Sequence, residues 1–181
     1  MPREDVAALG RNIALLLMDV DGVLTNGKLL YMPQAGGGVV ETKAFDAADG
    51  AAIGFLRRAG IKTGIISGRN SPAVTRRAEE LHMDFVYQGL GRHKLPAFAE
   101  ILERSGLEAS RVCYVGDDLQ DLPILARAGF PIAVRNARPE VLARATYVTQ
   151  TPGGEGAIRE VAELILKAQG KWESTLAEFL L

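Results

Sequence analysis

The sequence predicts an α/β fold built on a parallel sheet with helices on both faces. The first observation is a set of short apolar runs, each of which ends at glycine or a polar residue. Continuous runs of this kind are typical of strands buried on both faces of a parallel sheet. The second observation is that plausible helical segments separate the runs, and this alternation indicates a Rossmann-like arrangement. A length of 181 residues with 48% hydrophobic residues fits one domain spanning residues 1–181.

The expected strands and helices follow one another regularly along the chain. The first strand covers residues 13–18 and stops at Asp19, and the later strands are expected at 62–66, 85–87, 112–115, 130–134 and 147–148. Helices are expected at 51–59, 71–81, 94–105, 119–128 and 139–145. Ser71 is predicted to cap the second of these helices, because a helix-start proline follows it.

One segment, at about residues 24–44, breaks the alternation. It contains two extended pieces, 28–31 and 39–43, which are separated by a turn rich in glycine. This pattern predicts a β-hairpin. Because it follows the first strand directly, the hairpin should project from the carboxyl end of that strand.

Composition argues against several classes of protein. The formal net charge is -1, so the basic excess of a nucleic-acid-binding domain is absent. The longest apolar run, 13–18, is far shorter than the roughly 20 residues that cross a bilayer. No signal-peptide pattern stands at the start. We therefore expect a cytoplasmic protein without nucleic-acid or membrane partners.

Candidate site residues stand where the expected strands end. Ligands of open parallel sheets bind beyond the carboxyl ends of the strands, at the point where the strand order reverses. The polar segments at those ends are Asp19 to Gly22, Ser67 to Arg69 and Gly116 to Asp118, and Lys94 begins the intervening helix. Each feature alone is more often a turn or a cap, but their order and positions together are far more specific.

These segments resemble the four motifs of the haloacid dehalogenase superfamily. The matching segments are DVDGVLT at 19–25, IISGR at 65–69, Lys94 and GDDLQD at 116–121. Within the superfamily, the chain is similar to the phosphatases that act on 3-deoxy-D-manno-octulosonate 8-phosphate in lipopolysaccharide synthesis. Further similar stretches lie at 43–45, 49–50, 87–89, 147–149, 153–157 and 167–171.

The resemblance implies a covalent mechanism with two catalytic carboxylates. Asp19 would attack phosphorus and form an aspartyl-phosphate, which divides the reaction into two steps. Asp21 would protonate the leaving sugar oxygen and later deprotonate the attacking water.

The resemblance also implies a Mg²⁺ site and a phosphate site. Asp19, Asp117 and the backbone carbonyl of Asp21 would bind the metal, and oxygen ligands of this kind suit magnesium. Ser67 and Gly68 would hold phosphate oxygens. The ammonium of Lys94 would offset charge on the phosphoryl group.

Several neighbouring residues have weaker assignments. Arg69 is expected either to bind a carboxylate or phosphate of the substrate or to form a structural ion pair. Asp118 is expected to orient Lys94, and Asp121 to bind a metal-bound water. Asp49 and Gly50 are expected either to contact the sugar or to cap the helix beginning at Ala51. Ala48 departs from the basic residue that many close relatives carry just before this Asp-Gly.

The chain lacks the separate cap domain of most relatives, since only the hairpin and a short loop occupy the usual insertion points. The resemblance to capless phosphatases of this kind implies a homotetramer, in which hairpins of neighbouring subunits enclose each site. The tail at about 170–181 carries Trp172 and Phe179 and is a candidate lid over a neighbour's site.

The expected substrate is a small sugar-acid phosphate, 3-deoxy-D-manno-octulosonate 8-phosphate. One alternative is a nonulosonate 9-phosphate of the sialic acid type. Another is a non-catalytic assembly module, against which the complete set of strand-end residues argues.

Overall fold

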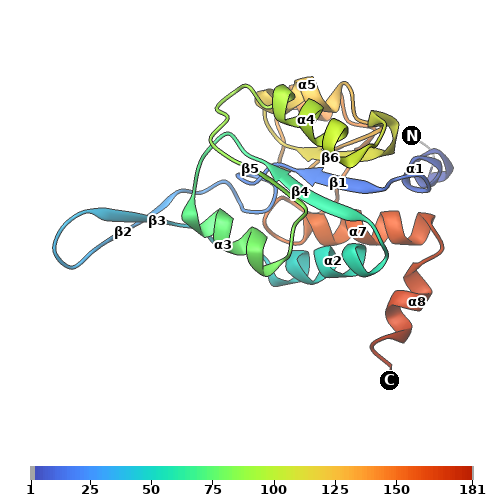
Figure 1. Ribbon diagram of the computed structural model, residues 1–181, viewed down its shortest axis with the longest axis horizontal. Helices are drawn as coiled ribbons and strands as arrows, with labels where there is room; N and C mark the ends of the chain where they lie inside the picture. Colours follow the sequence, from blue (N-terminus) through green and yellow to red (C-terminus); the bar gives the residue numbers. More distant parts are fainter. Residues whose placement is uncertain (1–2, 181) are drawn as a thin grey trace.

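The computed structural model describes residues 3–180 and contains a six-stranded, fully parallel sheet (Figure 1). The strands lie in the order β5-β4-β1-β6-β7-β8. Their bounds are β1 Leu15–Met18, β4 Lys62–Ile66, β5 Phe85–Tyr87, β6 Val112–Gly116, β7 Phe130–Ala133 and β8 Tyr147–Val148. The predicted α/β fold is thus confirmed, and each expected strand is present to within two residues at either end.

Strand β1 lies between β4 and β6. Leu15 of β1 pairs with Lys62 of β4 on one side and with Val112 of β6 on the other. All four β1 side chains are fully buried, which explains why this run has no polar alternation.

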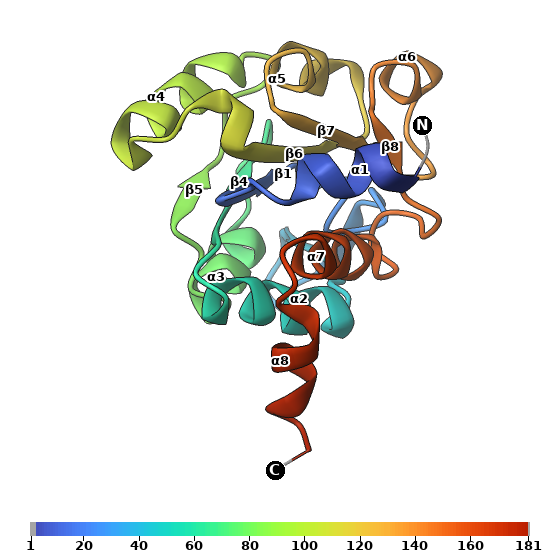
Figure 2. The same ribbon diagram turned by 90° about the vertical axis from the view of Figure 1, so that its right-hand side faces the viewer.

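Helices cover both faces of the sheet. Figure 2 shows α4 and α5 on one face and α2, α3 and α7 on the other. The helices are α1 Arg3–Gly10, α2 Ala47–Arg58, α3 Pro72–Glu80, α4 Leu95–Ser105, α5 Leu122–Leu125, α6 Pro139–Leu142, α7 Ala157–Ala168 and α8 Trp172–Ala177. Two 3₁₀ turns, η1 Ala109–Arg111 and η2 Leu119–Asp121, complete the described elements.

The helix boundaries differ from the predictions where local caps decide them. Helix α2 begins at Ala47 rather than near residue 51, because the side chain of Asp46 accepts the backbone N–H groups of Ala48 and Asp49. Ser71 occupies the N-cap position of α3, but its side chain makes no capping hydrogen bond. The single helix expected at 119–128 is instead η2 followed by α5.

Helix α1 was not predicted. Gly10 at its end lies against α7 so closely that a Cβ there would stand 2.8 Å from the Cβ of Ala168. This contact with a helix far along the chain supports α1.

The hairpin is confirmed and forms a separate two-stranded antiparallel sheet. Strands β2 Leu30–Pro33 and β3 Val39–Thr42 pair with Leu30 opposite Thr42. Glycines 36–38 all have positive φ, between 92° and 99°, which explains the glycine run in the turn. Figure 1 shows the hairpin projecting away from the body of the molecule. Within the described chain, this hairpin is the whole insertion between β1 and α2, so a cap domain is absent there.

The C-terminal segment packs on α2 of the same chain. The ring of Phe55 in α2 lies 6.4 Å from that of Trp172 and 5.5 Å from that of Phe179, centroid to centroid. Arg58 Nε lies 2.8 Å from Glu178 Oε2. Figure 1 shows α8 at the end of the molecule opposite the hairpin.

No helix in residues 3–180 has the length and apolar character needed to cross a membrane. Cys113 is fully buried within β6, and burial raises the pKa of its thiol, so it is a small core side chain.

Candidate active site

Three adjacent parallel strands deliver polar side chains to one edge of the sheet. Asp19 follows β1, Ser67 follows β4 and Asp117 follows β6. Since β4 and β6 flank β1, these residues converge, as expected for the carboxyl edge of a parallel sheet.

The carboxylate of Asp19 is buried beside the ammonium of Lys94. The residue is 1% exposed, and Lys94 Nζ lies 2.8 Å from its Oδ1 as an ion pair. Neither carboxylate oxygen has a well-aligned hydrogen bond from any described residue. Burial, and then the neighbouring charge of Asp121, raise the pKa of Asp19 to about 7, although Lys94 acts in the opposite direction.

Asp117 reaches the same space from β6. Its Oδ1 is also buried without a hydrogen-bond partner among the described residues. Burial and the charges of Asp19 and Asp121 raise the pKa of Asp117 to about 8. Gly22 lies directly beneath it, with a φ of 97°, and a Cβ at position 22 would stand 2.0 Å from Asp117 Oδ2. A glycine after Asp21 is therefore required by the close approach of the carboxylate.

Asp121, rather than Asp118, holds Lys94. Lys94 Nζ donates to Asp121 Oδ1 at 2.8 Å, and the side chain of Lys94 is fully buried. Although burial acts against the ammonium, Asp19 and Asp121 keep the pKa of Lys94 above its usual value. Asp118 is exposed and its Oδ1 accepts the backbone N–H of Leu119. The expectation that Asp118 orients Lys94 is therefore corrected, because the turn of η2 directs Asp121 back toward β6.

Asp121 is fixed by further hydrogen bonds. Tyr114 OH donates to its Oδ1 at 2.7 Å, and the backbone N–H groups of Asp117 and Asp118 donate to its Oδ2 at 3.0 and 3.2 Å. With its oxygens engaged in this way, Asp121 is a support for Lys94 and for the loop that carries Asp117.

The acidic residues fit a hard divalent cation. Asp19, Asp117 and Asp121 each offer one oxygen, and these oxygens lie within 4.8 Å of one another. Buried carboxylate oxygens without partners are costly, and a cation between Asp19 and Asp117 would remove that cost. Oxygen-only ligands are the kind that magnesium prefers.

The predicted phosphate-binding residues lie beside this cluster. Ser67 is 1% exposed, and its Oγ accepts the backbone N–H of Arg69 at 3.3 Å. A Cβ on Gly68 would stand 2.7 Å from the carbonyl oxygen of Gly91 and 2.8 Å from Gln120 Oε1. The close approach of these two loops therefore requires glycine at position 68.

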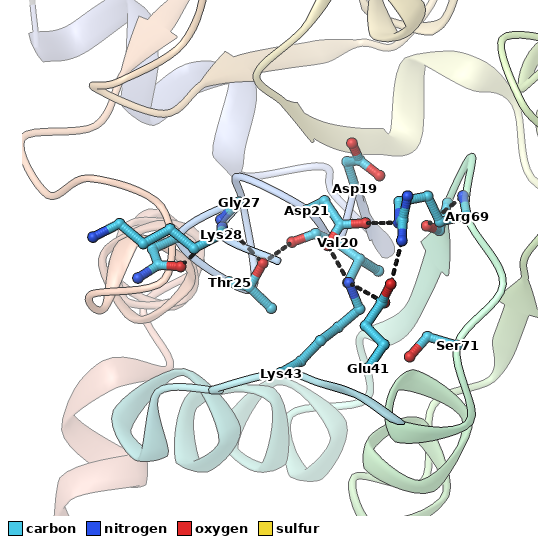
Figure 3. Close-up of polar contacts among 12 residues, drawn as sticks. Asp19, Val20, Asp21, Thr25, Gly27, Lys28, Glu41, Lys43, Arg69 and Ser71 are labelled. Atoms are coloured by element: carbon cyan, nitrogen blue, oxygen red, sulfur yellow. Dashed lines mark hydrogen bonds and ion pairs between the residues drawn. The ribbon is translucent and has the colours of Figure 1, made fainter. Parts of the chain in front are cut away.

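Asp21 belongs to a second cluster of charges, which sequence reasoning had only partly found (Figure 3). Lys43 forms an ion pair with Asp21 Oδ1, and Arg69 Nε lies 3.7 Å from Asp21 Oδ2. Glu41 pairs with both cations. Arg69 thus forms the ion pair that was one of its two expected roles. Lys43 and Glu41 were not predicted as site residues, although their spacing of two in an expected strand places them on one face.

Asp49 and Gly50 contact other helices. Asp49 is 1% exposed, and its Oδ1 accepts the backbone N–H of Arg159 at 2.8 Å, in the first turn of α7. A Cβ on Gly50 would stand 2.2 Å from Arg77 Nη2. The structure gives Asp49 a helix-capping role on α7, whereas its own helix is capped by Asp46. A contact of Asp49 or Gly50 with the sugar stays a prediction.

This burial predicts a pH-dependent contribution of Asp49 to stability. Burial raises the pKa of Asp49 from 3.8 to about 6, although the N–H of Arg159 opposes the shift. Between these pH values the folded state binds the proton that the unfolded state has lost, so the free energy of unfolding falls as pH rises. Relative to Asp49→Asn, the free energy of unfolding of the wild type should fall by about 2 kcal/mol between pH 4.5 and 7.5, as measured by urea unfolding. A difference independent of pH would contradict this prediction.

A separate cavity of about 690 Å³ has none of these carboxylates in its lining. It is bordered by α1, β8 and α7 and includes Tyr147, Leu164 and Lys167. We place the candidate active site at the strand ends instead, because the convergent ionisable groups are there.

Comparisons with known proteins show which family the chain resembles. A family model described as haloacid dehalogenase-like hydrolase matches residues 38–129. The 3-deoxy-D-manno-octulosonate 8-phosphate phosphatase KdsC of Escherichia coli (strain K12) is 44% identical over 167 residues, which is 92% of this chain and 86% of that protein.

Two solved structures are similar over nearly the whole chain. A probable YrbI family phosphatase from Pseudomonas syringae aligns with a TM-score of 0.92 and 42% identity, covering 98% of each chain. The second is the 3-deoxy-D-manno-octulosonate 8-phosphate phosphatase of Moraxella catarrhalis in complex with magnesium ion, phosphate ion and a KDO molecule. It aligns with a TM-score of 0.91 and 41% identity, covering 97% of this chain and 98% of that one.

The similarity and the site together identify the class of enzyme. The relatives are phosphatases at more than 40% identity, and the predicted strand-end residues converge in the structure. The chain is therefore a phosphoric monoester hydrolase, and it belongs to the haloacid dehalogenase-like hydrolase family.

Proposed function

We propose that this enzyme hydrolyses 3-deoxy-D-manno-octulosonate 8-phosphate to the free sugar acid and inorganic phosphate, as a step of lipopolysaccharide synthesis. The observation that carries the proposal is the pair of buried carboxylates, Asp19 and Asp117. Asp19 forms an ion pair with the buried Lys94, and Asp117 Oδ1 has no hydrogen-bond partner among the described residues. The substrate is supported by the similarity to the Moraxella catarrhalis phosphatase, whose structure contains KDO and phosphate.

In the first half of the proposed reaction, an oxygen of Asp19 attacks phosphorus. The bond between phosphorus and the sugar oxygen breaks, and that oxygen takes a proton from Asp21 and leaves as an alcohol. The phosphoryl group remains on Asp19 as an aspartyl-phosphate.

In the second half, water attacks the phosphorus of the aspartyl-phosphate. Asp21, now a carboxylate, takes one proton from that water as the new phosphorus–oxygen bond forms. The bond to Asp19 breaks, which releases inorganic phosphate and restores the carboxylate of Asp19 together with the proton on Asp21.

Other residues offset charge and orient the phosphoryl group. Lys94, held by Asp121, lies where it can balance the charge of the phosphoryl oxygens, and the Ser67 hydroxyl and Gly68 amide can donate to them. Mg²⁺, held by Asp19, Asp117 and the carbonyl of Asp21, would supply further stabilisation of negative charge. Arg69 is about half exposed, so its guanidinium is available to a sugar carboxylate at the rim.

A panel of substrates tests the proposed specificity. Phosphate release should be fastest from 3-deoxy-D-manno-octulosonate 8-phosphate, slower from a nonulosonate 9-phosphate and slowest from glucose 6-phosphate, which lacks a carboxylate. Activity should disappear with EDTA and return with Mg²⁺. Equal rates on all three substrates would contradict the assignment of the sugar acid, and full activity in EDTA would contradict the metal.

We also propose that the enzyme is a homotetramer assembled through its hairpins. The hairpin exposes a cluster of large apolar side chains, and an isolated two-stranded sheet is marginal in water. The exposed side chains are Leu29, Leu30, Tyr31, Met32, Val39 and Val40. Burial against neighbouring hairpins would cover these side chains and enclose each site.

A charge placed on the hairpin should disrupt this assembly. Val39 is 65% exposed, and Val39→Glu is expected to give smaller particles than wild type in light scattering, because a buried carboxylate opposes association. Val86→Glu is the matched control, since Val86 is an exposed valine of β5 outside the hairpin. A fully active wild-type monomer at the assay concentration would contradict the shared site.

The C-terminal tail remains a candidate lid in this assembly. It packs on α2 of its own subunit, at the end opposite the hairpin (Figure 1), so the site that it would cover belongs to a neighbour.

A further inference from the structure

The second hairpin strand returns to the catalytic carboxylates. Glu41 lies in β3 and Lys43 directly follows that strand, and their side chains turn toward Asp21 (Figure 3). The side chain of Lys43 is 1% exposed, although the hairpin itself is open to solvent. Its ammonium contacts Asp21 Oδ1 and lies 3.2 Å from Glu41 Oε1.

This buried ammonium is held entirely by carboxylates. A buried cation is unfavourable unless it is paired, so the two acids determine where Lys43 lies. The same contacts restrict Asp21, since one of its oxygens is engaged by Lys43 and the other faces Arg69 Nε at 3.7 Å. Arg69 is 45% exposed and lies farther from Asp21 than Lys43 does, which leaves the buried Lys43 as the firmer contact.

Glu41 forms ion pairs with both cations, Lys43 and Arg69. Although partial burial acts against it, Lys43 and Arg69 hold the pKa of Glu41 below its ordinary value. Glu41 therefore stays anionic at neutral pH and is the second carboxylate that pairs with Lys43.

We propose that Lys43 is a positioning residue, which holds the Asp21 carboxylate in place for the water-activating half of the reaction. The proposal rests on the proposed function, in which Asp21 starts this half-reaction as an anion. An ammonium beside it suits that anionic form and fixes the oxygen that receives the proton of the water. Misplacement of a catalytic group by about 1 Å can cost about 100-fold in rate.

The consequence is a specific kinetic signature. When the second half-reaction slows, the aspartyl-phosphate should accumulate. With p-nitrophenyl phosphate the first half-reaction depends little on a proton donor, because p-nitrophenolate leaves readily as an anion. A variant impaired at Asp21 should therefore release one rapid equivalent of p-nitrophenolate per subunit and then turn over slowly.

The experiment compares rapid-mixing bursts in wild type, Lys43→Met, Lys28→Met and Asp21→Asn. Lys28→Met is the matched control, because Lys28 is exposed on the same hairpin segment. Lys43→Met should lower the steady-state rate by about 10- to 100-fold and show a burst approaching one equivalent. Lys28→Met should behave as wild type, and Asp21→Asn should show the burst with a still slower steady state.

Each other outcome overturns a distinct statement. A burst in Asp21→Asn but none in Lys43→Met would refute the role of Lys43 and leave Asp21 as the base. No burst in Asp21→Asn would refute the base role of Asp21, and the proposal would fail with it. A higher KM confined to the sugar-acid phosphate would make Lys43 a substrate-binding residue instead.

A second variant covers the case in which Lys43→Met does not fold, as judged by circular dichroism. Lys43→Arg keeps the positive charge but cannot place it at the same point. It should show a burst with a steady-state rate between those of Lys43→Met and wild type. A folded Lys43→Arg that is slow without any burst would refute the proposal.

Discussion

Replacing Asp19 by asparagine is expected to lower turnover by about 10⁴-fold or more. The amide keeps the shape of the side chain but cannot act as the nucleophile, and losses of this order follow removal of a covalent nucleophile. Phosphate release from 3-deoxy-D-manno-octulosonate 8-phosphate measures the loss. Acid quenching during turnover should trap phosphate on the wild-type protein and none on the variant.

The same variant should fold at least as well as wild type without metal. Asp19 is a buried carboxylate crowded by Asp121 and Asp117, so the neutral amide relieves an unfavourable charge. Lys94 keeps its contact with Asp121. Asp118→Asn is the control for stability, because it replaces an exposed carboxylate that caps a turn. Near-normal turnover by Asp19→Asn would refute the covalent mechanism.

Replacing Asp117 by alanine is expected to abolish Mg²⁺-dependent activity. Its Oδ1 is unpartnered and lies within reach of Asp19, so its loss leaves the cation with one fewer anionic ligand. Isothermal titration of Mg²⁺ should show binding to wild type and none to the variant at millimolar metal.

Asp118→Ala is the matched comparison, because it removes a carboxylate from the next position. Asp118 is outside the acidic cluster, so its loss should cost about 10- to 100-fold at most, through the loop that holds Asp121. Equal or reversed effects of the two replacements would show that the ligand has been misassigned.

The arrangement of the strand-end residues could be predicted from local sequence patterns. The strand-end positions of Asp19, Ser67 and Asp117 follow from apolar runs that stop at polar residues, and parallel pairing brings such ends to one edge. Lys94 was identified at the start of its helix by resemblance, and the structure brings it to Asp19.

The sequence did not show which side chains of the site pair with one another. Asp118 and Asp121 lie three residues apart and look equivalent as neighbours of Lys94. The turn between them decides that Asp121 faces inward and that Asp118 faces solvent. The same holds for Asp49, whose partner in α7 is 110 residues away.

Patterns of residues along the chain were enough to predict the α/β fold, the hairpin and the strand-end carboxylates of this phosphatase. These features depend on the periodicity of apolar residues, on the lengths of the apolar runs and on the glycines of turns. All three can be recognised within short segments of the chain. Three contacts emerged from the folded structure: Lys43 reaches from the hairpin to Asp21, Asp121 supports Lys94, and Asp49 caps α7. Each of these is a pairing of buried charges or polar groups across distant segments, and such pairings depend on how the elements pack rather than on the residues beside them.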